Sequence, residues 1–239
     1  MKLSDYPARP NGIERNRAEA HGWGPGWPRC QKTKMAAVTK AGVTVYVHKE
    51  IAALVATLLE ATERQGYDVK PGQTWGFACR AIRGTDKPSN HSWGLAVDIN
   101  SLTNPMSTTF ASDIPPAIVA MWWAAGCFWG GWATKRPDTM HFEYVYRPSD
   151  VDRHLAIART YLTGHPWTGR IIRLAQPRMR GADVAWVQNR LNAKGASRRL
   201  VEDGVFGPKT EQALRAFQQK VGLAVDGVYG PLTHAALAS

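Results

Sequence analysis

Two short segments of the chain carry side chains of the types that bind metal ions or transfer protons. The first places His91 seven residues before Asp98, a carboxylate inside an otherwise apolar run. The second places Asp138 three residues before His141. Because an unpaired carboxylate is costly to bury, Asp98 requires a partner or a bound metal. Two imidazoles and one carboxylate can hold zinc at three positions and leave the fourth for water, from which Asp138 can take a proton.

Each of these residues also has a simpler interpretation. A single histidine is more often structural or exposed than a ligand. Asp98 can cap a helix or pair with Arg80 or Arg83. Glu143, two residues after His141 and therefore on the same strand face, is either a partner of that histidine or an ordinary paired acid. Since no short Cys/His signature is present, spacing alone leaves the zinc site as one interpretation among several.

The elements that must position these residues follow from hydrophobic periodicity and from breaker residues. We expect helices at residues 48–66, 115–126 and 151–162, a strand and loop at 72–83, and strands at 95–99 and 140–146. Strands and helices without a regular alternation predict an α+β domain, with a small antiparallel sheet and flanking helices.

The last third of the chain contains an internal repeat. Residues 203–210 read Asp-Gly-Val-Phe-Gly-Pro-Lys-Thr and recur 23 residues later as Asp-Gly-Val-Tyr-Gly-Pro-Leu-Thr. In each copy Asp-Gly favours a turn, and Pro suits the first turn of a helix. With an apolar helical face between the copies and another helix upstream, the pattern predicts a small all-α three-helix bundle.

The segment that joins the two parts is rich in structure-breaking residues. It reads Thr-Gly-His-Pro-Trp-Thr-Gly at positions 163–169. We therefore expect a first domain at residues 1–162, a linker at 163–174 and a second domain at 175–239.

Composition limits the class of protein. The chain has 239 residues, of which 44% are hydrophobic and 21% charged, so it can form a packed core. The absence of a bilayer-length apolar stretch predicts no stable membrane insertion, and the absence of a signal-type apolar core at the N-terminus predicts synthesis in the cytoplasm. An odd number of cysteines in an unexported chain predicts free, mostly buried thiols at Cys30, Cys79 and Cys127.

The charge of the chain points to an anionic partner. The net charge is +11, and residues 163–239 carry 11 Lys and Arg against 5 Asp and Glu. Nucleic acid and the acidic polymers of a bacterial wall both fit this charge. No stacking motif with basic residues between aromatic ones is present, so we expect no nucleic-acid partner.

The two chemistry-bearing segments resemble the paired motifs of the VanY-like family of D,D-carboxypeptidases and L-alanyl-D-glutamate endopeptidases. The family pattern is Ser-x-His followed by Gly, Ala and Asp, and later an acid-x-x-His. The resemblance implies that His91, Asp98 and His141 bind Zn²⁺ and that Asp138 is the general base. The positions that match this pattern are Ser89, His91, Gly94, Ala96, Asp98, Asp138 and His141.

Residues 79–84 resemble the arginine-bearing segment of the same family. This resemblance implies that Arg80 or Arg83 holds the substrate or the oxyanion, and we favour Arg80. Aspartate at position 138, where carboxypeptidase members often carry glutamate, is similar to the phage endopeptidase branch.

The C-terminal repeat resembles the peptidoglycan-binding domain found on many wall hydrolases, over about residues 175–239. Together the resemblances imply a zinc metallopeptidase that binds bacterial peptidoglycan and cleaves stem-peptide amide bonds with zinc-activated water. A monomer is the default expectation, because nothing in the sequence indicates an oligomeric state. The implied activity is that of an L-alanyl-D-glutamate or related endopeptidase, in a phage endolysin that reaches the wall at phage-induced lysis. The alternatives are a D-Ala-D-Ala carboxypeptidase that trims wall precursors, a non-catalytic cell-wall-binding protein and a nucleic-acid-binding protein.

Overall fold

The structure is a computed structural model that describes residues 1–162 and 170–238. The chain divides into two compact units, residues 1–158 and residues 159–239. In the described ranges, none of the helices has the length and apolar character needed to span a bilayer.

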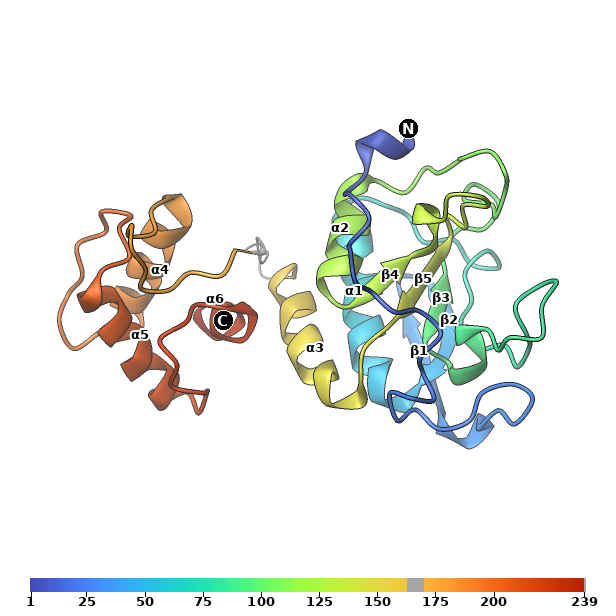
Figure 1. Ribbon diagram of the computed structural model, residues 1–239, viewed down its shortest axis with the longest axis horizontal. Helices are drawn as coiled ribbons and strands as arrows, with labels where there is room; N and C mark the ends of the chain where they lie inside the picture. The colour runs from blue at the N-terminus through green and yellow to red at the C-terminus, as the bar shows by residue number, and fades with distance from the viewer. Residues whose placement is uncertain (163–169, 239) are drawn as a thin grey trace. The chain divides into compact units, whose positions relative to one another are not determined.

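The N-terminal unit is built on two small antiparallel sheets (Figure 1). The first is a hairpin of β1 (Met35–Lys40) and β2 (Val43–His48). The second has the order β3-β5-β4, from β3 (Ala96–Asp98), β5 (His141–Tyr144) and β4 (Cys127–Trp129). In the register of this sheet Asp98 is paired with His141. The sheet therefore brings the two segments singled out from the sequence side by side.

Helices flank these sheets. The predicted α+β class is therefore confirmed. Helix α1 (Ala52–Arg64) packs against β1, and α2 (Pro116–Ala124) packs against β4. Helix α3 (Val151–Thr160) follows β5. Short 3-10 helices occupy Leu3–Asp5, Lys32–Lys34, Lys49–Ile51, Asn90–Trp93, Gly130–Trp132 and Pro148–Asp150. The largest fully buried side chains of this unit are Trp23, Trp122, Trp129, Tyr144, Phe128 and Phe142.

The predicted strand within residues 72–83 is wrong. Trp75 forms an isolated bridge with Asp98, through two backbone hydrogen bonds of 3.1 and 2.9 Å. Two residues later the Phe77 amide donates instead to the carbonyl of Tyr46 on β2. Because neighbouring residues bond to different strands, this segment joins the two sheets and forms no ladder of its own.

The N-terminal arm, residues 1–31, lies along the N-terminal unit and is attached by tryptophan and tyrosine side chains. The Tyr6 hydroxyl donates to the Ile114 carbonyl at 2.7 Å. The Trp132 indole donates to the Pro7 carbonyl at 2.7 Å, and the Trp93 indole donates to the Gly24 carbonyl at 2.7 Å. The arm is therefore part of the folded unit.

The prediction of free thiols is wrong for two of the cysteines. Cys30, at the end of the N-terminal arm, forms a disulfide with Cys79, and their Cα atoms lie 5.9 Å apart. The two residues are separated by 49 positions in sequence, so their proximity depends on how the arm folds back. Cys127 is free and buried, as expected.

The C-terminal unit is all helical, as predicted, with α4 (Ala182–Ala193), α5 (Pro208–Lys220) and α6 (Pro231–Ala238). The sequence repeat corresponds to two turns that are each held by a buried glutamine. The Gln188 amide donates to Asp203 at 2.9 Å and accepts from the Gly204 amide at 2.9 Å. Gln218 repeats this arrangement in the second turn, with Asp226 and Gly227.

Only part of the predicted linker, 163–174, can be compared with the structure. Residues 163–169 lie outside the described residues. Ile172 is buried and exchanges two backbone hydrogen bonds with Tyr229, at 3.0 and 2.8 Å. Residues 170–174 are thus attached to the C-terminal unit.

Candidate metal centre

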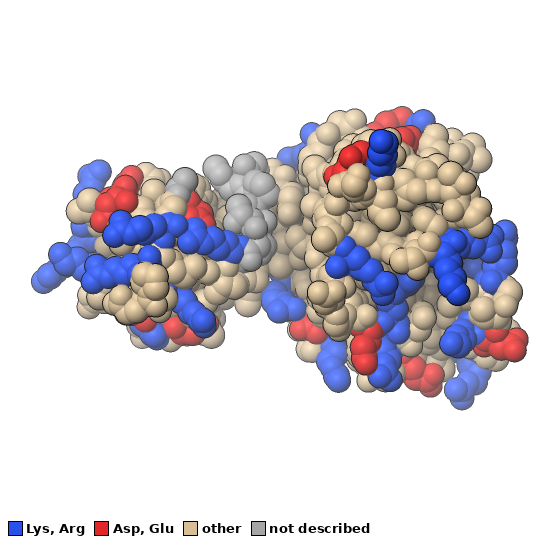
Figure 2. Space-filling model, turned by 45° about the horizontal axis from the view of Figure 1, so that its top comes forward, with Lys and Arg blue, Asp and Glu red and all other residues tan. Residues whose placement is uncertain are grey.

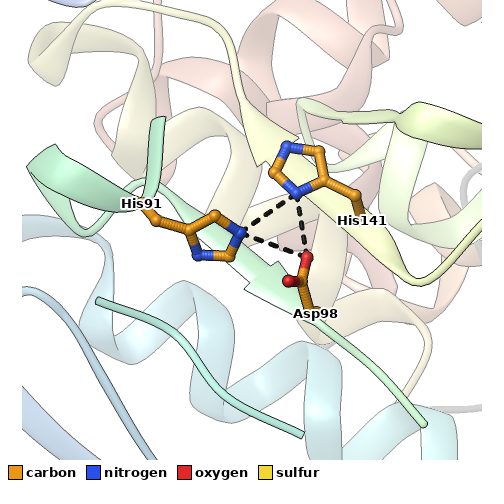
Figure 3. Close-up of side chains that lie close together, drawn as sticks. All are labelled: His91, Asp98 and His141. Carbon is orange, nitrogen blue, oxygen red and sulfur yellow. Dashed lines mark hydrogen bonds and ion pairs between the residues drawn. The ribbon is translucent and has the colours of Figure 1, made fainter. Parts of the chain in front are cut away.

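The side chains of His91, Asp98 and His141 meet in the N-terminal unit (Figure 3). His91 Nε2 lies 3.2 Å from Asp98 Oδ1 and 3.2 Å from His141 Nδ1. His141 Nδ1 lies 2.9 Å from Asp98 Oδ1. All three side chains are buried. The described residues thus include two nitrogen atoms and one oxygen atom of ligand type that face a common point.

The local backbone explains why these residues meet. His91 lies on the 3-10 helix Asn90–Trp93, which ends at Gly94 with a left-handed φ of 69°. A Cβ at Gly94 would lie 2.6 Å from the His48 amide nitrogen, so glycine allows this turn to pack directly on β2. Asp98 ends β3, and His141 opens β5 opposite it.

Each ligand-type residue uses its second polar atom for a contact with the protein. His91 Nδ1 donates to the Gly76 carbonyl at 2.6 Å. The Trp75 indole donates to Asp98 Oδ2 at 2.9 Å, and His141 Nε2 donates to Glu143 at 3.1 Å. These contacts direct the remaining atoms toward one another, which is how metal ligands are commonly oriented.

The electrostatics of the cluster favour a cation. Burial alone raises the pKa of Asp98, but the charges and hydrogen bonds of His91 and His141 outweigh this and hold its pKa well below the usual range. Burial lowers the pKa of His141, yet hydrogen bonds to Asp98 and Glu143 raise it to about 10. An environment that stabilises a positive charge on His141 would also stabilise a metal ion. The residues therefore fit Zn²⁺ by donor type, by number and by charge.

Asp138 lies in the wall of the same cleft, on the turn that leads into β5. Its backbone carbonyl accepts from the His141 amide at 3.2 Å, and its own amide donates to the Gly130 carbonyl at 3.1 Å. A Cβ at Gly130 would lie 2.5 Å from the Asp138 carbonyl oxygen and 3.1 Å from His141 Cβ, so glycine permits this close packing. Burial raises the pKa of Asp138, and its Oδ1 is buried without a hydrogen-bond partner among the described residues. A carboxylate in this state has an increased affinity for a proton.

The cluster opens into a cleft of about 710 Å³. Arg80 and Arg83, the two arginines predicted to hold substrate, both line this cleft and are exposed. The structure thus brings together all six site residues named from the sequence. The cleft wall also includes the largely apolar side chains of Trp75, Met106 and Met140.

Some residues around the centre were not found from the sequence. Trp75 was assigned to a strand, and its bond to Asp98 depends on a bridge across 23 residues. Arg15, in the N-terminal arm, lines the cleft and forms an ion pair with Glu143. No local pattern links residues 128 positions apart, so only the fold identifies this pair.

Comparison with family models gave two matches. Residues 83–144 match the model described as D-alanyl-D-alanine carboxypeptidase, and residues 180–237 match a model for a peptidoglycan binding domain. The searches of curated proteins and of solved structures gave no match. Both resemblances inferred from the sequence are therefore confirmed, and the pair of matches supports a peptidoglycan hydrolase.

Proposed function

We propose that this chain is a zinc-dependent peptidoglycan hydrolase that cleaves an amide bond of the stem peptide. One observation carries the proposal: the buried cluster of His91, Asp98 and His141 opens, beside Asp138, into the cleft of about 710 Å³. The peptidoglycan binding match at residues 180–237 supports the choice of substrate.

In this proposal the three clustered side chains hold Zn²⁺, which when bound polarises a carbonyl and lowers the pKa of water. Asp138 accepts the proton of the attacking water at a carboxylate oxygen. It then delivers this proton to the amine that leaves as the amide bond breaks. Arg80 or Arg83 holds the substrate on the exposed side of the cleft, where a guanidinium can meet a carbonyl oxygen or a carboxylate.

Two bonds are candidates for cleavage, the L-alanyl-D-glutamate bond and the D-Ala-D-Ala bond, and each has one observation in its favour. Aspartate at position 138 supports an L-alanyl-D-glutamate or related endopeptidase, because it is similar to the phage endopeptidase branch. The description of the matched family supports a D-Ala-D-Ala carboxypeptidase. We favour the endopeptidase.

A phage endolysin that reaches the wall at lysis is the setting that we propose for this activity. A hydrolytic unit joined to a unit that matches a peptidoglycan binding domain suits an enzyme that must destroy an insoluble wall. Fractionation of an expressing culture tests this setting. The protein should stay in the cell fraction until a lysis protein opens the membrane, and export without lysis would contradict it.

Mass spectrometry of fragments from purified peptidoglycan tests the activity, with wild type beside Asp138→Ala. New L-Ala and D-Glu termini that appear only with wild type would support the endopeptidase. Free D-alanine alone would identify a carboxypeptidase instead. Identical fragments from both proteins would show that Asp138 is not the base.

A further inference from the structure

Glu143 is a buried carboxylate that the proposed reaction does not use directly. It is 2% exposed and lies on β5, two residues after His141. One of its oxygen atoms accepts from the Asn90 side-chain amide at 2.7 Å and from His141 Nε2 at 3.1 Å. The other oxygen atom accepts from Arg15 Nε. Glu143 thus connects a candidate zinc ligand to the N-terminal arm.

Arg15 is held in place by more than this ion pair. Its guanidinium carbon lies 4.7 Å from the centre of the Phe128 ring, a cation–π geometry. Its side chain lines the cleft and is 32% exposed, whereas that of Glu143 is 2% exposed. Arg15 also lies outside residues 83–144, the segment matched by the carboxypeptidase family model.

A buried carboxylate needs a cationic partner, because an uncompensated charge in the interior is costly. Arg15 supplies that partner from outside the sheet. If Arg15 is lost, Glu143 is left with one amide donor and the His141 ring, and the chain can relax by moving Glu143 away from the ring. His141 would then lose the contact that directs its Nδ1 toward Asp98 and His91.

We propose that Arg15 is a positioning residue of the metal centre, through which the N-terminal arm fixes His141 by way of Glu143. This inference rests on the proposed zinc binding. Contacts that orient a metal-ligating histidine typically change metal affinity by 10- to 100-fold. Arg15 therefore contributes to zinc affinity although it does not touch the metal.

The test is the zinc affinity of the full-length protein, measured by competition with a chromophoric chelator. We expect Arg15→Gln to bind zinc about tenfold more weakly than wild type, and Arg15→Lys to recover part of the loss because it keeps the charge. The matched control is Arg17→Gln, in the same arm. Among the described residues, the Arg17 side chain pairs with the exposed Glu14, and its replacement should leave zinc affinity unchanged.

A double-mutant cycle with Glu143→Gln shows whether the effect passes through the carboxylate. In the Glu143→Gln background, Arg15→Gln should cause no further loss, because the charge that Arg15 compensates is absent. Thermal unfolding of the zinc-free variants distinguishes lost positioning from lost folding. A wild-type protein without zinc affinity would refute the proposed function itself. If wild type and Arg15→Gln bind zinc with the same affinity, only this inference is refuted. The same holds if the losses of zinc affinity in Arg15→Gln and Glu143→Gln add up in the double variant, because the two residues would then act independently.

Discussion

At the scale of single residues, the metal centre depends on the different contacts that the two polar atoms of each ligand-type side chain make. One atom faces the shared point, and the other is bonded to the protein. Trp75 and Gly76 are adjacent in sequence, yet they hold Asp98 and His91 respectively. A single irregular segment thus orients two of the three side chains before any ion binds, which reduces the conformational entropy lost on binding.

Replacing Trp75 by phenylalanine tests this arrangement. The change removes the 2.9 Å bond to Asp98 Oδ2 and keeps an aromatic ring at a site that is 40% exposed. We expect zinc affinity to fall about tenfold while the free energy of unfolding of the zinc-free protein changes little. Chelator competition measures the first quantity and urea unfolding the second. Tyr46→Phe, at another exposed aromatic residue of this unit, is the control and should change neither.

His154 makes stability depend on pH away from the centre. Burial lowers its pKa to about 4, and its Nδ1 lies 2.9 Å from the Tyr144 hydroxyl. The unfolded chain, with a histidine pKa of about 6.5, therefore binds the proton first as pH falls. The contribution of His154 is fully present above pH 6.5 and is lost between pH 6.5 and 4, by about 3 kcal/mol.

Urea unfolding of wild type and His154→Phe at several pH values measures this contribution. As pH falls from 6.5 to 4, the unfolding free energy of wild type should decrease relative to that of His154→Phe. A constant difference across this range would contradict the assignment to His154.

At the scale of elements, the helices, strands and turns that were predicted correctly are those with hydrophobic periodicity or typical turn residues. Helix α1, the strands that carry Asp98 and His141, and the glutamine-held turns of the C-terminal repeat all follow local patterns. The β1–β2 hairpin was missed because its two turn residues, Ala41 and Gly42, are both left-handed, with φ values of 52° and 68°. Alanine is not a signal for such a turn, which usually contains Asn-Gly or Asp-Gly.

The contacts that surround the centre were missed for a different reason. The Cys30–Cys79 disulfide, the Trp75–Asp98 bond and the Arg15–Glu143 pair each join segments that are distant in sequence. Residue type and local spacing indicate which side chains can bind a metal. The partners that orient them depend on how the N-terminal arm and the segment of residues 72–83, after α1, fold back, and these have no periodic pattern.

The segment at Gly76 gives a prediction at this scale. A Cβ at this position would lie 2.2 Å from the Tyr46 carbonyl oxygen, a backbone atom of β2 that cannot easily move. Gly76→Ala should therefore push the segment away from β2, displace the carbonyl that accepts from His91, and destabilise the protein by about 1 to 3 kcal/mol.

Urea unfolding and zinc affinity measured together test this prediction. Both should fall in Gly76→Ala. Gly207→Ala is the matched control, because its added Cβ meets only the end of the Arg178 side chain, at 3.7 Å. An unaltered zinc affinity in Gly76→Ala would mean that the Gly76 carbonyl does not orient His91.

At the scale of the whole molecule, both units carry an excess of basic residues. Each presents Lys and Arg side chains on the face seen in Figure 2. In the C-terminal unit several acidic groups serve the fold: Asp183 pairs with Arg170, and Asp203 and Asp226 hold the two turns. The positive charges that remain are available to attract an anionic wall, and this attraction should weaken as salt screens it.

Separating the units tests whether the C-terminal unit acts by raising local concentration. Full-length protein and a chain of residues 1–162 should cleave a small soluble stem peptide at rates within about twofold, because the cleft lies entirely in the N-terminal unit. On insoluble wall the shortened chain should be at least about tenfold slower, because a tethered binding unit holds the catalytic unit near its substrate. Added salt should narrow the gap by weakening binding of the full-length protein to the wall. Equal losses on soluble and insoluble substrates would instead mean that the C-terminal unit supports the folding or the chemistry of the N-terminal unit, and the concentration argument would then fail.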